Sequence, residues 1–155
     1  MQIREGSKTS SLVWALIIVS FVGFLDSSYL LAEKLLGRTP TCFIGGGCEV
    51  VTTSSYSVIF GVPIALFGAF FYLVVLLSSL LYQDFKNFIF IKIIVSLSFL
   101  AFLVSLYFVY LQFFVLKALC PYCLLSAGSS TLLFVFSSSL GLRMKIRLLI
   151  LKNED

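Results

Sequence analysis

The chain has 155 residues, of which 60% are hydrophobic and 12% are charged, and its formal net charge is +4. Soluble domains carry about 25% charged residues, so this composition predicts a polytopic membrane protein with a single domain. The sequence has no histidine. This excludes catalytic triads with an imidazole base, histidine-ligated haem and the common Cys/His zinc sites.

Four stretches are apolar enough to cross a hydrocarbon core of about 30 Å as helices. They cover residues 12–36, 61–82, 88–116 and 120–141. Pro63 falls in the first turn of the second stretch, where proline is tolerated. We therefore expect an all-α membrane protein, a four-transmembrane-helix bundle, that forms one integral membrane domain over residues 1–155.

The distribution of Lys and Arg predicts the orientation of these helices. Four helices place both termini on one side, and that side carries eight basic residues against three on the other: Arg4, Lys8, Lys86, Lys92, Arg143, Lys145, Arg147 and Lys152 against Lys34, Arg38 and Lys117. Both termini are therefore expected in the cytoplasm. The first span has no A-x-A-like cleavage site and is expected to be retained. The basic tail 142–155 is expected to lie along the anionic inner leaflet.

All four cysteines are expected on the opposite, extracytoplasmic side. Cys42 and Cys48 fall in the only long connection, residues 37–60, and Cys120 and Cys123 open the fourth span on the same side. Disulfides form and persist in such an oxidising compartment.

The motif Cys-Pro-Tyr-Cys at residues 120–123 suits a dithiol that cycles between two oxidation states. Thiols at i and i+3 share one helix face and are close enough to form a bridge. Proline suits a helix start, and the positive end of the helix dipole favours the thiolate, which is the reactive form.

The loop pair has a different character. Cys42 and Cys48 bracket F-I-G-G-G, whose glycines make the backbone compliant, so a disulfide here could open, swing and form again. Spacing alone leaves two alternatives: static disulfides that hold the loop down, or a metal site built from all four cysteines. Disulfide formation outside the cytoplasm competes with such a metal site.

Electrons that reach a dithiol in the membrane need an acceptor. The sequence has no glycine-rich dinucleotide turn and no histidine pair for haem, so a lipid-soluble quinone that enters the bundle is the simplest choice. Asp26 lies within the first span, where it is expected either to cap and stabilise the bundle or to handle the protons of quinone reduction.

Three motifs together resemble the vitamin K epoxide reductase family, in its prokaryotic branch. They are C-x5-C followed by E-V-V-T-T-S, then F-G-V-P-I-A-L-F-G at the second span, and C-x2-C at the fourth, and they cover most of residues 42–127. The resemblance implies a four-helix bundle around a quinone (menaquinone, ubiquinone or a related one). It also implies that the extracytoplasmic loop or short helix between helices 1 and 2 caps the site, and no metal is expected.

The resemblance also assigns roles to residues. Cys42 would exchange with a thioredoxin-like partner, Cys48 would pass electrons to Cys120 through a transient bridge, and Cys123 would reduce the quinone. Ser54 matches a family serine near the quinone, with Ser57 and Cys123 as further quinone-binding candidates. The animal enzymes that reduce vitamin K epoxide carry asparagine and tyrosine where this chain has Ser57 and Ala127, which favours plain quinone reduction.

The sequence thus predicts a membrane thiol:quinone oxidoreductase that supports disulfide formation in exported proteins, in the cytoplasmic membrane of a prokaryote. Because the chain stops at Asp155 without a thioredoxin-like domain, the partner is expected to be a separate extracytoplasmic oxidase, with the quinone pool and the lipid bilayer as the other partners and no nucleic acid. The alternatives are a non-enzymatic membrane protein with structural disulfides and a small transporter or metal-handling protein.

Overall fold

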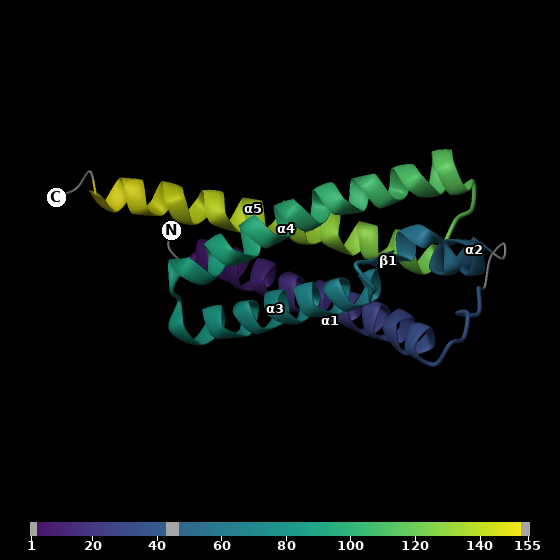
Figure 1. The fold of residues 1–155 in the computed structure, drawn as a ribbon. Coiled ribbons are helices and arrows are strands. Elements are labelled where there is room, and N and C mark those ends of the chain that lie inside the picture. Colours follow the sequence, from purple (N-terminus) through teal and green to yellow (C-terminus); the bar gives the residue numbers. More distant parts are fainter. Residues whose placement is uncertain (1–2, 43–46, 153–155) are drawn as a thin grey trace.

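A computed structural model of the chain describes residues 3–42 and 47–152. Its four long helices are α1 (Ile3–Leu35), α3 (Ile64–Phe85), α4 (Phe88–Tyr110) and α5 (Pro121–Lys152). They lie side by side along one axis, and α1 begins at the same end of the bundle as α5 ends (Figure 1). The expected fold class, an all-α four-helix membrane bundle, is confirmed.

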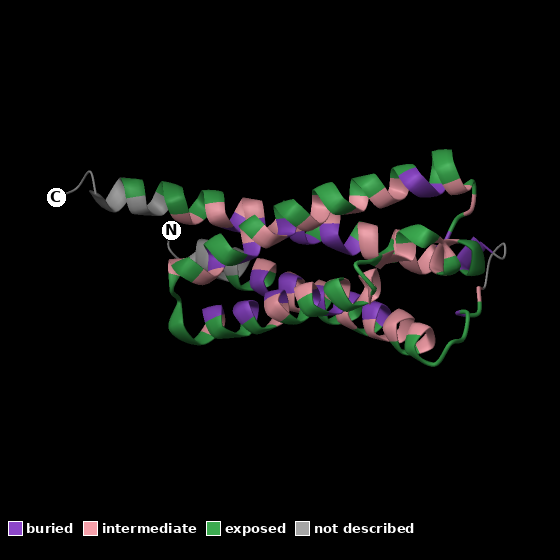
Figure 2. Ribbon diagram, in the orientation of Figure 1, coloured by how far each residue is buried: buried purple, intermediate pink, exposed green. Residues whose placement is uncertain are grey.

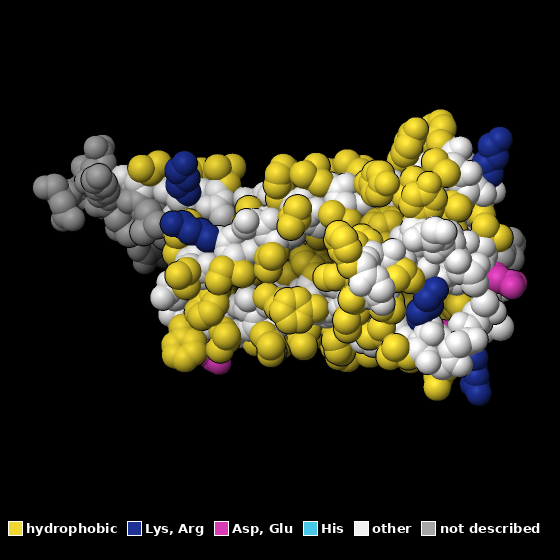
Figure 3. Space-filling model, in the orientation of Figure 1, with side chains coloured by type: hydrophobic (Ala, Val, Ile, Leu, Met, Phe, Trp, Pro, Cys, Tyr) yellow, Lys and Arg dark blue, Asp and Glu magenta, His cyan; other side chains and the backbone are white. Residues whose placement is uncertain are grey.

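Four helical segments are long and apolar enough to cross a membrane: Ser10–Leu35, Ile64–Phe85, Phe88–Leu116 and Pro121–Ile146. The third comprises α4 and the helical turn that follows it. On the face shown in Figure 3, hydrophobic side chains cover the middle of the bundle, and Lys and Arg side chains lie toward its two ends. Such a belt suits contact with lipid tails.

The packed core lies within the bundle, on the inward faces of all four helices (Figure 2). Its buried side chains come from every long helix: Val13, Leu16, Tyr72, Val75, Tyr82, Ile91, Ile94, Leu133 and Leu140. Gly23 lets α1 and α3 approach closely, because a Cβ at this position would lie 2.6 Å from two atoms of the Tyr72 ring. Small residues at helix contacts serve the same purpose in other membrane bundles.

Two residues, Lys86 and Asn87, connect α3 to α4. Lys86 adopts the left-handed conformation (φ 51°), and its amide donates to the Tyr82 carbonyl at 3.0 Å. Asn87 then caps α4, because its side chain accepts a hydrogen bond from the Ile89 amide at 3.0 Å. These caps satisfy backbone groups that helix ends leave without partners.

At the other end of the bundle, a short helix and a hairpin connect α1 to α3. They comprise α2 (Gly47–Thr53), the 3-10 turn η1 (Ser55–Ser57) and the strands β1 (Val58–Ile59) and β2 (Val62–Pro63). The strands pair antiparallel, Val58 with Pro63 and Ile59 with Val62. We call this segment, residues 47–63, the cap. The sequence predicts a helix from residue 61, whereas α3 begins at Ile64 because residues 58–63 form the hairpin.

The hairpin turn consists of Phe60 and Gly61, which both have positive φ, 50° and 82°. A two-residue turn of this kind matches the twist of paired strands, although glycine or asparagine is the usual choice at its first position.

Two further differences concern α4 and α5. The last turn of the third span is a π-helix, η2 (Leu111–Leu116), which ends at Lys117 in the left-handed conformation. The fourth helix does not end near residue 141 but continues to Lys152, so that its last part projects beyond the other helices (Figure 1).

Candidate functional site

The two loop cysteines form a disulfide. Cys42 and Cys48 are bonded with Cα atoms 5.8 Å apart, and the Cys48 amide donates to the Cys42 sulfur at 3.1 Å. Cys48 is fully buried, whereas Cys42 is only partly buried. The glycine run between them, which the sequence predicts to be compliant, lies outside the described residues except for Gly47. A reagent from solvent therefore meets Cys42 before Cys48.

The start of α2 rests directly on the chain that leads into Cys120. A Cβ added to Gly47 would overlap the Leu119 carbonyl and lie 2.8 Å from the Leu119 amide nitrogen. Only glycine allows this approach. Cys48, the next residue after Gly47, and Cys120, the next residue after Leu119, are both fully buried. The cap thus brings the loop pair to the helix pair.

A second contact holds the loop on the start of α5. The Tyr122 hydroxyl donates to the Thr41 carbonyl at 3.3 Å, and the Tyr122 ring lies 5.3 Å from the ring of Tyr29 on α1. The sequence alone does not predict these contacts for either tyrosine. Thr41, which precedes Cys42, is therefore hydrogen-bonded to α5, and Gly47, which precedes Cys48, rests on Leu119 just before α5.

Cys120 and Cys123 occupy the first turn of α5. The Cys120 carbonyl accepts from the Leu124 amide at 3.0 Å, so Cys120 caps the helix and Pro121 takes its first position. Both thiols are free. The positive end of the helix dipole therefore acts on this turn, as the sequence predicts.

Gln112 fixes the backbone at Cys120, a role that is not among those predicted from the sequence. Its side chain lies in the π-helical turn, is 2% exposed, and accepts the Cys120 amide at Oε1 over 2.9 Å. Short π-helical segments within helices occur often at functional sites. One feature of the sequence could have identified Gln112. It is an amide side chain within an apolar span, and such a group needs a hydrogen-bond partner when it is buried.

Electrostatics favour the thiolate at Cys120. A hydrogen bond from the Cys123 thiol lowers the pKa of Cys120 from 9.0 to about 7, against the opposing effect of burial. Hydrogen bonds with the Cys123 and Tyr122 backbone act in the same direction. This shift of the pKa favours the thiolate of Cys120, which is the form that attacks disulfides.

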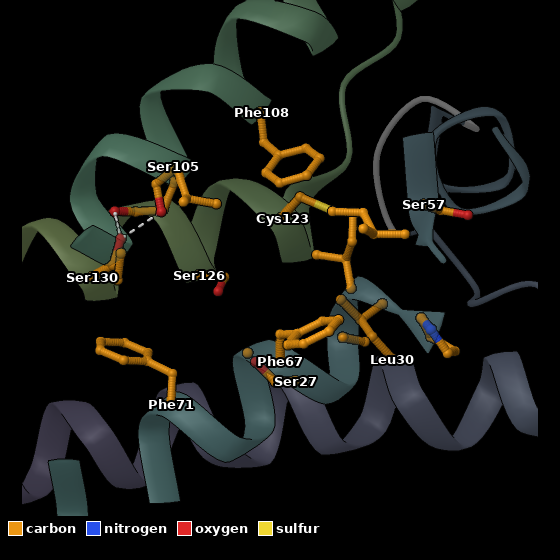
Figure 4. A pocket seen from close by; sticks show the side chains of 18 of the residues that line it. Ser27, Leu30, Ser57, Phe67, Phe71, Ser105, Phe108, Cys123, Ser126 and Ser130 are labelled. Carbon is orange, nitrogen blue, oxygen red and sulfur yellow. Dashed lines mark hydrogen bonds between the residues drawn. The ribbon is translucent and has the colours of Figure 1, made fainter. Parts of the chain in front are cut away.

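A cavity of about 700 Å³ opens between the helices beneath the cap. Its wall is mostly apolar and includes side chains from all four long helices and from the cap, and Cys123 belongs to it whereas Cys120 does not. Figure 4 shows Cys123 close to Phe108 and across the cavity from Phe67 and Ser27. Cavities of this size and character typically hold organic ligands.

The serines expected to bind quinone line this cavity, but each of their hydroxyl groups already donates its proton to a backbone carbonyl. The Ser54 hydroxyl donates to the Val51 carbonyl at 2.7 Å, and the Ser57 hydroxyl donates to the Ser54 carbonyl at 2.8 Å. Ala127, the other position at which the chain departs from the animal enzymes, also lies in the wall. Ser57 and Ala127, the two positions that differ from the animal enzymes, thus line the same cavity.

Further polar groups line the cavity between α3, α4 and α5. The Tyr72 hydroxyl donates to the Ser126 carbonyl at 2.7 Å. The hydroxyls of Ser105 and Ser130 lie 2.8 Å apart, and Ser130 also bonds to the Ala127 carbonyl at 2.9 Å (Figure 4). These bonds link the helices around the cavity.

Asp26 is buried at 8% exposure, and its Oδ2 has no hydrogen-bond partner among the residues that the structure describes. It does not line the cavity, but its neighbour Ser27 does. Within residues 3–42 and 47–152, no three His, Cys, Asp or Glu side chains are grouped so that they could hold a metal ion.

Comparison with known proteins agrees with this arrangement. Residues 14–138 match the sequence profile of the Vitamin K epoxide reductase family. A stretch of 52 residues is 46% identical to Thiol-disulfide oxidoreductase LTO1 of Arabidopsis thaliana, which corresponds to 33% of this chain. The chain matches only 14% of the length of that relative.

Proposed function

Because the chain belongs to the vitamin K epoxide reductase family and is an integral membrane protein, we propose that it is a thiol:quinone oxidoreductase. It takes electrons from a thioredoxin-like partner and passes them to a quinone. The observation that carries this proposal is the position of the helix dithiol. Cys120 follows the residue on which the cap rests, and Cys123 forms part of the cavity wall.

Electrons enter at the loop pair. A thiolate of the reduced partner attacks the sulfur of Cys42, Cys48 leaves as a thiolate, and the second partner thiol then displaces Cys42. The partner leaves with a new disulfide, and both loop cysteines are reduced. The greater exposure of Cys42 supports its assignment as the point of entry.

The electrons then move to the helix pair. The Cys48 thiolate attacks Cys120 in a Cys120–Cys123 disulfide, and Cys123 leaves as a thiolate. Cys42 next displaces Cys120, which restores the loop disulfide and leaves two helix thiols. In this scheme, the form of the protein with a loop disulfide and two free helix thiols is the one that reduces quinone.

Quinone is the substrate of the last step. Two electrons and two protons pass from Cys120 and Cys123 to the quinone, which becomes a hydroquinone, while a Cys120–Cys123 disulfide forms. The size and apolar wall of the cavity support a ring of this kind beside Cys123. Ser54 and Ser57 remain candidates for contact with it, and serine and alanine at residues 57 and 127 favour quinone over epoxide as substrate.

We further propose that this chemistry takes place on the extracytoplasmic side of the cytoplasmic membrane of a prokaryote, with both termini in the cytoplasm. The count of basic residues on the two sides supports this orientation. The net result is a supply of disulfides for exported proteins.

The test is quinone reduction by the purified full chain, with a reduced thioredoxin-like protein as donor and a short-chain ubiquinone as acceptor. We expect turnover in the wild type and none in Cys123→Ala, although the donor should still reduce the Cys42–Cys48 disulfide of the variant. Wild-type turnover in Cys123→Ala would refute the mechanism. If the donor never reduces any cysteine and Cys→Ala variants only lose stability, the disulfide is structural and the proposal is wrong.

A further inference from the structure

The cap side of the cavity offers few free hydrogen-bond donors for a ligand oxygen. A quinone oxygen accepts hydrogen bonds, so it requires a donor. Ser54 and Ser57 both donate to backbone carbonyls. A hydroxyl group has only one proton, so these two serines have none left to offer in this arrangement.

Lys34 is different. It stands near the end of α1 and lines the cavity. Its ammonium donates to the Thr52 carbonyl at 2.7 Å and to the Ser57 hydroxyl at 3.1 Å. An ammonium has three donors, so one N–H remains after these two bonds.

The charge of Lys34 distinguishes it from the other polar groups in the wall. Ser27 and Tyr56 also line the cavity, but their hydroxyls are neutral. Lys34 is the only lining residue with a charged side chain among those that the structure describes. Within that part of the chain, no carboxylate forms an ion pair with it. The charge of Lys34 therefore acts on a ligand in the cavity without a carboxylate beside it that neutralises it.

Electron transfer from Cys123 makes the quinone oxygens more negative before protons arrive. A positive group fixed beside the oxygen stabilises that charge more strongly than it stabilises the neutral ligand. The two bonds to the cap hold the ammonium in place in advance, so little reorganisation is needed during the reaction.

We infer that Lys34 donates a hydrogen bond to one oxygen of the bound quinone and stabilises the negative charge that this oxygen gains from Cys123. This inference rests on the proposed function, because it assigns a residue to the same site. It also gives Lys34 two tasks, since the same ammonium attaches the cap to α1 through Thr52 and Ser57.

The test compares the wild type with Lys34→Met and Lys34→Arg as full chains in lipid nanodiscs. Lys117→Met is the matched control, because Lys117 is exposed and does not line the cavity. Three quantities are measured. They are the carbonyl stretching band of bound carbonyl-labelled ubiquinone in infrared spectra, kcat/KM for that quinone, and the rate at which the reduced loop pair reduces a Cys120–Cys123 disulfide without quinone.

We expect Lys34→Met to lose about 10- to 100-fold in kcat/KM for quinone, as for other hydrogen bonds from charged groups. Its carbonyl band should shift toward that of free quinone, whereas thiol exchange without quinone should slow much less than kcat/KM falls, because the cap also rests on Leu119. Lys34→Arg should recover most of both quinone signals, and Lys117→Met should equal the wild type.

Two results would overturn the inference. One is a wild-type carbonyl band and kcat/KM in Lys34→Met. The other is slow thiol exchange in this variant together with an unchanged carbonyl band, which would limit Lys34 to attaching the cap. Failure of the proposed function looks different, because the wild type itself would then exchange thiols without reducing quinone.

Discussion

At the end of the bundle where α3 turns into α4, side chains fill the space between the helices. Tyr82, Ile91 and Leu140 are buried together there, and the Tyr82 hydroxyl bonds to the Met144 sulfur at 3.0 Å. At the cap end, the same helices separate around a cavity of about 700 Å³. Polar contacts close that end instead: Lys34 to the cap, Gln112 to Cys120, and Tyr122 to the loop.

The comparison indicates a division of tasks within one short chain. Apolar side chains gain little by moving from lipid to a helix contact, so the packed end is stabilised by close fit. At the cap end the helices pack less closely and leave space for a ligand. Hydrogen bonds set the positions of the cysteines there. Changes at the packed end should therefore affect stability, and changes at the cap end should affect electron transfer.

The largest effect is expected at the contact between α2 and the chain before Cys120. Gly47→Ala places a Cβ against the Leu119 backbone, which cannot move away as a side chain can. We expect thiol exchange between the loop pair and the helix pair to slow by about tenfold or more, since overpacking of this kind costs about 1–3 kcal/mol. Rapid quenching with an alkylating reagent measures this rate.

Gly128→Ala is the control for that experiment, because a Cβ at Gly128 meets no atom within 4 Å. It should exchange thiols at the wild-type rate. Equal rates in the two alanine variants would show that the cap does not need to rest on Leu119, and the proposed contact between the two pairs would fail.

The packed end can be tested with Leu16→Ala, which removes a fully buried side chain. We expect a loss of about 1–3 kcal/mol in the free energy of unfolding, mainly from the cavity left behind. Reversible unfolding in mixed micelles measures this loss. Leu132→Ala, which removes a side chain exposed at 46%, should change stability little. An altered KM for quinone in a folded Leu16→Ala protein would contradict the division between the two ends.

Gln112→Leu tests whether thiol exchange at Cys120 depends on the hydrogen bond to Gln112 or only on the volume of its side chain. The variant keeps a similar volume but leaves the Cys120 amide without its acceptor, so we expect thiol exchange at Cys120 to slow by about tenfold. Gln112→Glu retains an acceptor oxygen and should recover part of the rate. If both variants exchange thiols like the wild type, Gln112 does not position Cys120.

The smallest effect concerns pH. With Cys42 and Cys48 replaced by alanine, the helix thiols are the only cysteines left to titrate, and the ultraviolet absorbance of the thiolate reports their charge. Because the pKa of Cys120 is lowered to about 7, the thiolate is present above this pH and is lost as the pH falls through it. Replacing Cys123 by alanine as well removes the hydrogen bond, so the midpoint should rise. A midpoint that stays unchanged would contradict this cause.

Span length and charge were enough to predict the fold class, and cysteine spacing was enough to group Cys42 with Cys48, which form a disulfide. They could not separate core from lipid-facing positions, because both are apolar in a membrane bundle. The second strand of the hairpin, Val62–Pro63, was predicted to begin the second helix, since a two-residue strand carries little pattern. Gln112 and Lys34 were missed as site residues because their roles depend on contacts over 8, 18 and 23 residues.

The most direct test of the account traps the link between the two cysteine pairs. In a chain with Cys42→Ala and Cys123→Ala, Cys48 and Cys120 have no other partners, and mass spectrometry can map any disulfide between them after mild oxidation in the membrane. The account predicts a Cys48–Cys120 disulfide in nearly all molecules. Two free thiols under the same conditions would contradict it, because electrons could not then pass from the loop to the quinone site by this route.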